Sequence, residues 1–91
     1  MNGDWRVKLT NQARRQLQNL PDRLQDEVRE VLQNMLEDPF PSGSVQLRGW
    51  NNQHRIRANG YRIIYQANRQ RRTVLVTRIL HRPVAYEGLE R

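Results

Sequence analysis

The sequence predicts a small α+β domain in which a two-helix hairpin packs on one face of an antiparallel β-sheet, in the order β-α-α-β-β-β. Apolar side chains recur at helical spacing between residues 10 and 36, whereas they alternate with polar ones from residue 45 onward. Asn59-Gly60 also stands between two alternating runs, which is typical of a hairpin turn with positive φ at both positions. At 91 residues the chain has room for one modest core, so residues 1–91 are expected to form a single domain.

The first half of the chain is expected to form a short strand and both helices. Residues 5–9 (WRVKL) alternate apolar and basic side chains, as a strand does, and Thr10 is a plausible N-cap for the helix that follows. Pro21 either ends this helix or begins the second one, where its missing N–H costs nothing. The loop 38–44 contains two prolines and a glycine and ends the second helix. The apolar stripes of the two helices comprise Ala13, Leu17, Leu20, Leu24, Val28, Val31, Leu32, Met35 and Leu36.

The second half is expected to supply the rest of the sheet. Residues 45–50 (VQLRGW) predict one short strand, and residues 54–65 (HRIRANGYRIIY) predict the hairpin. Residues 73–80 (TVLVTRIL) carry apolar side chains on both faces, which is typical of a central strand. Strict alternation places one set of this strand's side chains on one face, namely Val74, Val76, Arg78 and Leu80. The set on its other face is Leu75, Thr77 and Ile79.

Alternation along the predicted hairpin separates an apolar face from a basic face. The side chains of the apolar face, which should pack on the core, are Ile56, Tyr61, Ile63 and Tyr65. Arg55, Arg57 and Arg62 then converge on the opposite face, and Arg78 and Arg82 can join them from the following strand. Closely spaced guanidinium groups repel one another, so protein stability does not explain this arrangement, whereas an anionic ligand does.

The charge of the whole chain favours the same interpretation. The net charge is +7, and 15 of the 16 basic residues are arginine. Between Asp38 and Glu87 there are nine arginines and no acidic residue. Guanidinium binds phosphate through two parallel hydrogen bonds and stacks on bases, so nucleic acid is the favoured ligand over a membrane surface. The alternative is an arginine-rich surface that serves only solubility. Five arginines are expected to contribute to nucleic-acid binding: Arg48, Arg69, Arg71, Arg72 and Arg78.

The side chains available restrict the chemistry. The chain has no cysteine, two histidines and no Gly-rich phosphate loop, so neither a metal site nor a cofactor is expected. No apolar run reaches the length of a signal peptide or a membrane span, and a cytoplasmic location is expected. Arginine, Tyr86 and His81, with His54 as a weaker candidate, remain for phosphate chemistry. Such a set suits attack by an RNA 2′-hydroxyl on its own phosphate, which requires neither a metal nor a water nucleophile.

Two stretches together resemble the RelE/ParE superfamily of toxins from toxin–antitoxin pairs, and specifically its RelE-like branch. They are LRGWNNQHRIRANGYRIIYQ at 47–66 and VTRILHRPVAYEGL at 76–89. The resemblance extends over nearly the whole chain and implies the fold described above. It also implies a ribosome-dependent endoribonuclease that cleaves mRNA in the A site of the small subunit.

The resemblance implies a set of catalytic residues: Arg55, Arg57, Arg62, Arg82 and Tyr86. Arg55 and Arg57 stand where lysine is often found in the family, and because arginine stays protonated either is a poorer proton shuttle. Other branches use histidine or glutamate for acid–base work, so His81 is a further candidate. Whether Tyr86 or His81 acts as the acid–base is left open by the sequence.

The same superfamily offers a second function, because ParE-like toxins inhibit DNA gyrase by binding it and are not nucleases. The arginines together with Tyr86 favour the nuclease. The resemblance also implies a cognate acidic antitoxin as partner, with operator DNA bound only through the toxin–antitoxin complex, and no membrane partner.

Overall fold

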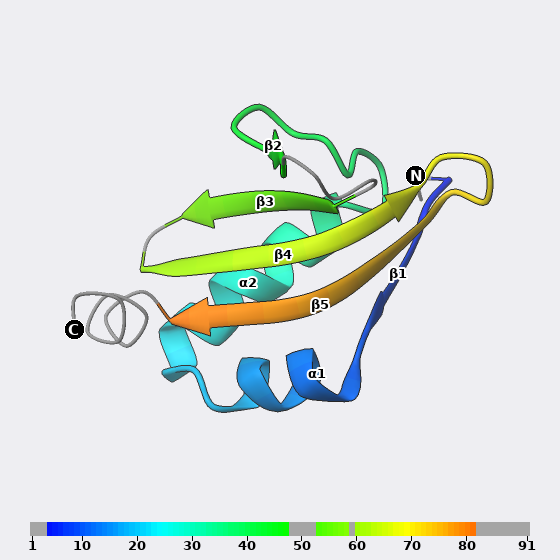
Figure 1. The fold of residues 1–91 in the computed structure, drawn as a ribbon. Coiled ribbons are helices and arrows are strands. Elements are labelled where there is room, and N and C mark those ends of the chain that lie inside the picture. Colours follow the sequence, from blue (N-terminus) through cyan, green and yellow to red (C-terminus); the bar gives the residue numbers. More distant parts are fainter. Residues whose placement is uncertain (1–3, 48–52, 59, 82–91) are drawn as a thin grey trace.

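The computed structural model describes residues 4–47, 53–58 and 60–81 (Figure 1). In chain order the elements are β1 (Arg6–Leu9), α1 (Asn11–Gln18), α2 (Asp22–Asn34), β2 (Val45–Gln46), β3 (Gln53–Ala58), β4 (Tyr61–Asn68) and β5 (Thr73–His81). The strands form one sheet in the order β1-β5-β4-β3-β2. The α+β class and the helical hairpin are confirmed.

The sheet differs from the expectation in two details. Four strands follow the helices, because the hairpin contributes β3 and β4 in addition to β2 and β5. The pairing of β1 with β5 is parallel, whereas the other pairs are antiparallel. The sheet is therefore mixed, and β5 lies inside it between β1 and β4, as its apolar sequence predicts.

Helix α1 begins where the sequence places its cap. Thr10 is extended, with φ −66° and ψ 165°, and its Oγ1 accepts a hydrogen bond from the backbone N–H of Ala13 at 3.1 Å. This bond satisfies one of the amides that a helix leaves without an internal partner in its first turn. Pro21 occupies the N-cap of α2 with ψ 149°, so it ends the connection from α1 and does not continue that helix.

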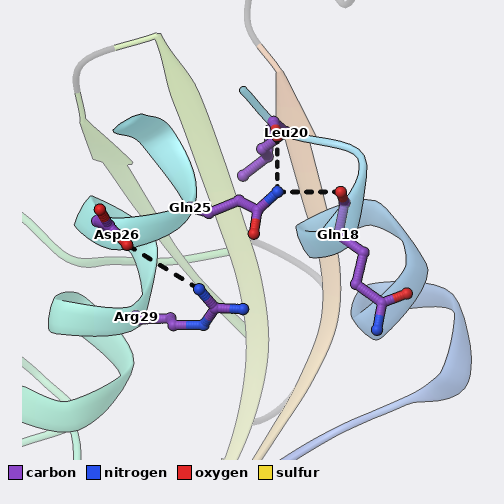
Figure 2. Close-up of polar contacts among 5 residues, drawn as sticks. All are labelled: Gln18, Leu20, Gln25, Asp26 and Arg29. Carbon is purple, nitrogen blue, oxygen red and sulfur yellow. Dashed lines mark hydrogen bonds and ion pairs between the residues drawn. The ribbon is translucent and has the colours of Figure 1, made fainter. Parts of the chain in front are cut away.

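The end of α1 is joined to α2 by one side-chain amide (Figure 2). Nε2 of Gln25 donates hydrogen bonds to the carbonyl oxygens of Gln18 at 3.0 Å and Leu20 at 2.8 Å. The carbonyl of Gln18 belongs to the last residue of α1, where internal donors are lacking, and that of Leu20 lies in the connection to α2, so this amide links the two helices. The nearby ion pair of Asp26 with Arg29, at 4.0 Å and well exposed, adds little stability.

Both helices pack on one face of the sheet, and the core lies between the two layers (Figure 1). Its members come from α1, α2, the residues just after each helix and the helix-facing side of β3, β4 and β5. They are Ala13, Leu17, Leu20, Leu24, Val28, Met35, Ile56, Tyr61, Ile63, Tyr65, Val74, Val76 and Ile79. At one end of the core the buried hydroxyl of Tyr65 donates a hydrogen bond of 2.6 Å to the carbonyl of Pro39.

The predicted hairpin is confirmed by its register. Ala58 pairs with Tyr61, which leaves a two-residue loop, and Gly60 in that loop has φ 81°. Asn59 lies outside the described residues. Glycine adopts this left-handed conformation without steric cost, so the loop residue predicted from the sequence fits the turn.

The alternation predicted for the last strand is wrong in part. Ile64 pairs with Arg78 and Tyr65 pairs with Val76, so Thr77 is an extra residue, a β-bulge, opposite the junction between them. Val74 and Val76 are therefore buried with Ile79, and they do not share a face with Arg78 and Leu80. The expectation that Arg78 joins the hairpin arginines is confirmed.

Candidate nucleic-acid interface

The face of the sheet away from the helices, here the open face, carries four arginines from three neighbouring strands. On the hairpin Arg57 pairs directly with Arg62, and Arg55 pairs with Ile64. Ile64 in turn pairs with Arg78. Cross-strand partners point to the same side of a sheet, and Ile63 and Tyr65 of β4 point to the helices. Arg55, Arg57, Arg62 and Arg78 therefore form one group on the open face, the arginine cluster.

Sheet geometry sets the spacing within the arginine cluster. Directly opposed residues such as Arg57 and Arg62 have Cβ atoms about 4.5–5.5 Å apart. Arg55 and Arg78 lie on either side of Ile64, so two strand spacings of roughly 4.8 Å each separate their backbones. Arginine side chains are long enough to span these distances. The four guanidinium groups can therefore converge on a single phosphate, or on two adjacent phosphates of one strand.

A hollow of about 550 Å³ opens on this face next to two members of the cluster. Arg62, Ile64, Arg78 and Leu80 line it from β4 and β5. The remaining lining residues are Gln12, Leu47, Gln53 and Thr77. An apolar floor with guanidinium and amide groups at its border suits a nucleotide, whose base is flat and apolar and whose phosphate is charged.

The described residues offer this cluster no acidic partner. The two ion pairs among them join Asp26 to Arg29 and Asp4 to Arg72, and neither includes a member of the cluster. The Nε of Arg55 is buried and has no hydrogen-bond partner in the described part of the chain. A buried N–H without a partner is unfavourable, as are like charges directly opposite each other in a sheet. An anion would remove both costs.

The structure does not bring the two histidines together with the arginine cluster. His81 pairs with Tyr61, a core residue, so the register directs it to the helix side of the sheet. His54 is buried on the same side, stacked on Tyr65 and edge-on to Phe40. A role for His81 as acid–base beside the arginines is therefore not supported by its position, and neither is one for His54.

The surroundings of His54 and Tyr61 shift the pKa values of both side chains. Burial lowers the pKa of His54 below its usual value of 6.5, and the positive charge of Arg69 lowers it further. Burial raises the pKa of Tyr61, with a further contribution from the carboxylates of Glu27 and Glu30. His54 therefore favours the neutral form and Tyr61 the protonated form, as expected of structural residues.

The remaining predicted RNA-binding arginines lie in different situations. Arg72 has a positive φ of 56° and pairs with Asp4 at 2.7 Å, and Arg69 lies 4.1 Å over the ring of Phe40. Arg71 is exposed in the same turn. Arg69 and Arg72 thus have structural contacts that compete with a role in binding RNA. Predicted site residues that lie outside the described part of the chain are Arg48, Arg82 and Tyr86.

Two basic residues on the open face were missed by the sequence reasoning. In the parallel pairing of β1 with β5, Arg6 is the partner of Thr73 and Lys8 is the partner of Leu75. Leu75 is exposed between the buried Val74 and Val76, so Lys8 shares the open face with it. The alternation of residues 5–9 contained this signal, because Val7 and Leu9 pack against the core and leave the two basic side chains on the other side.

Two further observations apply to the described residues alone. No group of three or more His, Asp or Glu side chains among them is placed to hold a metal ion. None of the helices that they form is long and apolar enough to cross a membrane.

The family of the chain is shown by its sequence. Residues 7–86 match the family model described as "ParE toxin of type II toxin-antitoxin system, parDE". The chain belongs to this family. It is a toxin of a type II toxin–antitoxin system within the RelE/ParE superfamily, and its fold is similar to that of solved RelE toxins. A search among curated proteins finds no match.

The toxin is similar to several solved RelE structures. The toxin–antitoxin complex RelBE2 of Mycobacterium tuberculosis matches with a TM-score of 0.77 and 28% identity, over 88% of this chain and 93% of that one. The RelE–RelB complex of Pyrococcus horikoshii matches with a TM-score of 0.77 and 25% identity, over 86% and 94% of the two chains. The isolated RelE toxin of E. coli, at 21% identity and a TM-score of 0.75 over 94% and 96%, shares the fold.

Proposed function

We propose that this toxin is a metal-independent endoribonuclease that cleaves mRNA in the A site of the ribosome and so stops translation. The observation that carries the proposal is the direct pairing of Arg57 with Arg62 on the open face, next to Arg55 and Arg78. Four cations in a small area, without a carboxylate from the described residues, form a site for phosphate groups. The resemblance of residues 47–66 and 76–89 to the RelE-like branch is the reason to propose a ribosomal substrate, which would place the toxin in the cytoplasm.

The proposed reaction uses a nucleophile that RNA itself carries. The 2′-oxygen attacks the adjacent phosphorus, the bond from phosphorus to the 5′-oxygen breaks, and the products end in a 2′,3′-cyclic phosphate and a 5′-hydroxyl. One proton leaves the 2′-hydroxyl and one is delivered to the 5′-oxygen. Negative charge grows on the phosphate oxygens in the transition state, and positioned guanidinium groups stabilise that charge. The substrate supplies the nucleophile, so no metal-bound water is required.

The proposed roles follow from position and chemistry. Arg62 and Arg78 line the hollow and would contact the scissile phosphate, whereas Arg55 and Arg57 would hold it from β3. These side chains stay protonated and do not shuttle protons. The proton transfers are therefore assigned to Tyr86, with Arg82 as an additional phosphate contact. Arg48 and Arg71 would bind the ribosome.

The alternative is inhibition of DNA gyrase through protein binding. The observation in its favour is the family model, whose description names ParE. Four closely spaced arginines without an acidic partner among the described residues match the charge and the hydrogen-bond acceptors of phosphate groups. The arginine cluster therefore favours the nuclease.

An acidic antitoxin is the proposed partner. The relatives from M. tuberculosis and P. horikoshii were solved as toxin–antitoxin complexes. An acidic segment that covers the arginine cluster would remove its self-repulsion and block the substrate. Operator DNA would then be bound only through the antitoxin.

The test compares the products of the two activities. The purified toxin is added to ribosomes stalled on a defined mRNA and, separately, to gyrase with supercoiled DNA. The proposal predicts mRNA cut within the A-site codon, with a 2′,3′-cyclic phosphate at the new 3′ end and intact DNA. Trapped gyrase–DNA breaks with intact mRNA would contradict it and support the alternative.

A further inference from the structure

The β-bulge at Thr77 determines which side of the sheet Arg78 faces. Val76 pairs with Tyr65 and Arg78 pairs with Ile64, so Thr77 takes no partner of its own on β4. If β5 paired regularly, two residues of separation would put Arg78 on the same side as the buried Val76. The extra residue reverses this and places Arg78 on the open face within the arginine cluster.

Three hydrogen bonds hold the bulge in place, and two of them are made with α1 and its cap. The hydroxyl of Thr77 donates to the carbonyl of Ile64 at 3.3 Å, and the hydroxyl of Thr10 donates to the carbonyl of Thr77 at 3.4 Å. The shortest contact is that of the backbone N–H of Ile79, which donates to Oε1 of Gln16 at 2.7 Å. Thr77 and Ile79, the residues on both sides of Arg78, are therefore each held by a partner on α1 or its cap.

The side chain of Gln16 accepts a hydrogen bond from β5 beyond the residues that pair with β1. The pairing of β1 with β5 ends at Leu9 and Val76, and the N–H of Thr10 donates to the carbonyl of Val76 at 3.0 Å. Beyond this point the edge of β5 faces α1 and no longer pairs with β1. A partly buried N–H needs an acceptor, and the side-chain amide of Gln16 supplies it for Ile79.

We infer that Gln16 is a positioning residue, which holds the end of β5 so that the bulge keeps Arg78 directed at the substrate phosphate. This inference rests on the proposed function for its catalytic consequence, but not for its structural part. Loss of the acceptor would free the N–H of Ile79 and let β5 shift around the bulge. Small displacements of a charged group relative to a reacting phosphate reduce the rate strongly.

The test uses Gln16→Leu, which removes the acceptor and keeps the size of the side chain. Its matched control is Gln18→Leu, the same change at an exposed position of the same helix. Gln16→Glu keeps an oxygen at the position and serves as the rescue variant. Each is measured by single-turnover mRNA cleavage and by amide hydrogen exchange of Ile79, in the wild-type and the Arg78→Ala backgrounds.

Gln16→Leu should accelerate the exchange of the Ile79 amide about tenfold or more and lower cleavage by about tenfold. Gln18→Leu and Gln16→Glu should stay within about twofold of the wild type. In the Arg78→Ala background, Gln16→Leu should lower cleavage no further, because its effect passes through Arg78. An equal loss in both backgrounds, or unchanged exchange at Ile79, would overturn the inference.

Two further measurements apply if Gln16→Leu does not fold or if the wild-type toxin does not cleave mRNA. If Gln16→Leu does not fold, Thr77→Val removes the bond to Ile64 from the other side of the bulge and must show the same dependence on Arg78. If the wild-type toxin does not cleave mRNA, the proposed function fails. Ile79 exchange and proton–proton contacts between Arg78 and Ile64 in the Gln16 variants still decide whether Gln16 holds Arg78 in place.

Discussion

Replacing Arg57 with glutamine should make the toxin more stable, although it removes a predicted catalytic residue. Arg57 lies directly opposite Arg62. Two unit charges roughly 7 Å apart in water repel each other by about 0.6 kcal/mol. Arg55, two residues away on the same strand, adds a smaller contribution. The free energy of unfolding of Arg57→Gln should therefore exceed that of the wild type by roughly 0.5–1 kcal/mol at low ionic strength, which lies within the range of about 0.2–1 kcal/mol for cross-strand pairs.

The assay is urea unfolding at about 10 mM and about 1 M salt, where the Debye length falls from roughly 30 Å to 3 Å. The increase in the free energy of unfolding of Arg57→Gln should be present at low salt and vanish at high salt. Arg29→Gln is the matched control, because it makes the same change in net charge but removes an ion pair with Asp26. Its effect should be neutral or slightly destabilising. If Arg57→Gln is no more stable than wild type at low salt, the arginine cluster is not under electrostatic repulsion.

Three further predictions concern single positions. Burial lowers the pKa of His54 in the folded protein below the unfolded value of about 6.5. Above pH about 6.5 the side chain is neutral in both states and stability is unaffected, whereas below it the unfolded state binds a proton first. The free energy of unfolding therefore decreases as the pH falls toward the folded-state pKa, by up to about 1.4 kcal/mol per pH unit. His54→Phe should show less of this loss in urea titrations between pH about 7.5 and 5. Gly60→Ala should cost about 1–2 kcal/mol in urea unfolding, because φ is 81° while the added Cβ meets only Leu24 at 3.9 Å. His81→Ala should leave the single-turnover cleavage rate within about twofold of wild type. A rate about 10²-fold lower would make His81 an acid–base candidate again.

The hairpin and its basic face could be predicted from sequence because a two-residue turn fixes the register. Once Asn59-Gly60 is accepted as the loop, alternation alone assigns Arg55, Arg57 and Arg62 to one side, and the structure confirms this. The two helices could be predicted equally well, because the Thr10 cap and the apolar stripes are local sequence signals. These features depend on residues close together in the chain.

The bulge could not be predicted in the same way. Thr77 is an ordinary strand residue, and the groups that hold the bulge, Thr10 and Gln16, lie 67 and 63 residues from their partners in β5. Alternation therefore placed Val74 and Val76 on the wrong face. The position of His81 also follows from the register, because it depends on pairing with Tyr61. The choice between nuclease and gyrase inhibitor is a property of the site, which the fold alone does not determine.

The most direct test of the proposed function is single-turnover cleavage by Arg62→Ala on ribosomes programmed with a defined mRNA, with ribosome binding measured in parallel. Cleavage should fall by roughly 10² or more, the scale for removing one donor that stabilises transition-state charge. Binding should change much less, because the other arginines still attract phosphate. An unchanged cleavage rate, or a loss of binding that accounts for the whole loss of cleavage, would contradict the role of the arginine cluster in the chemistry.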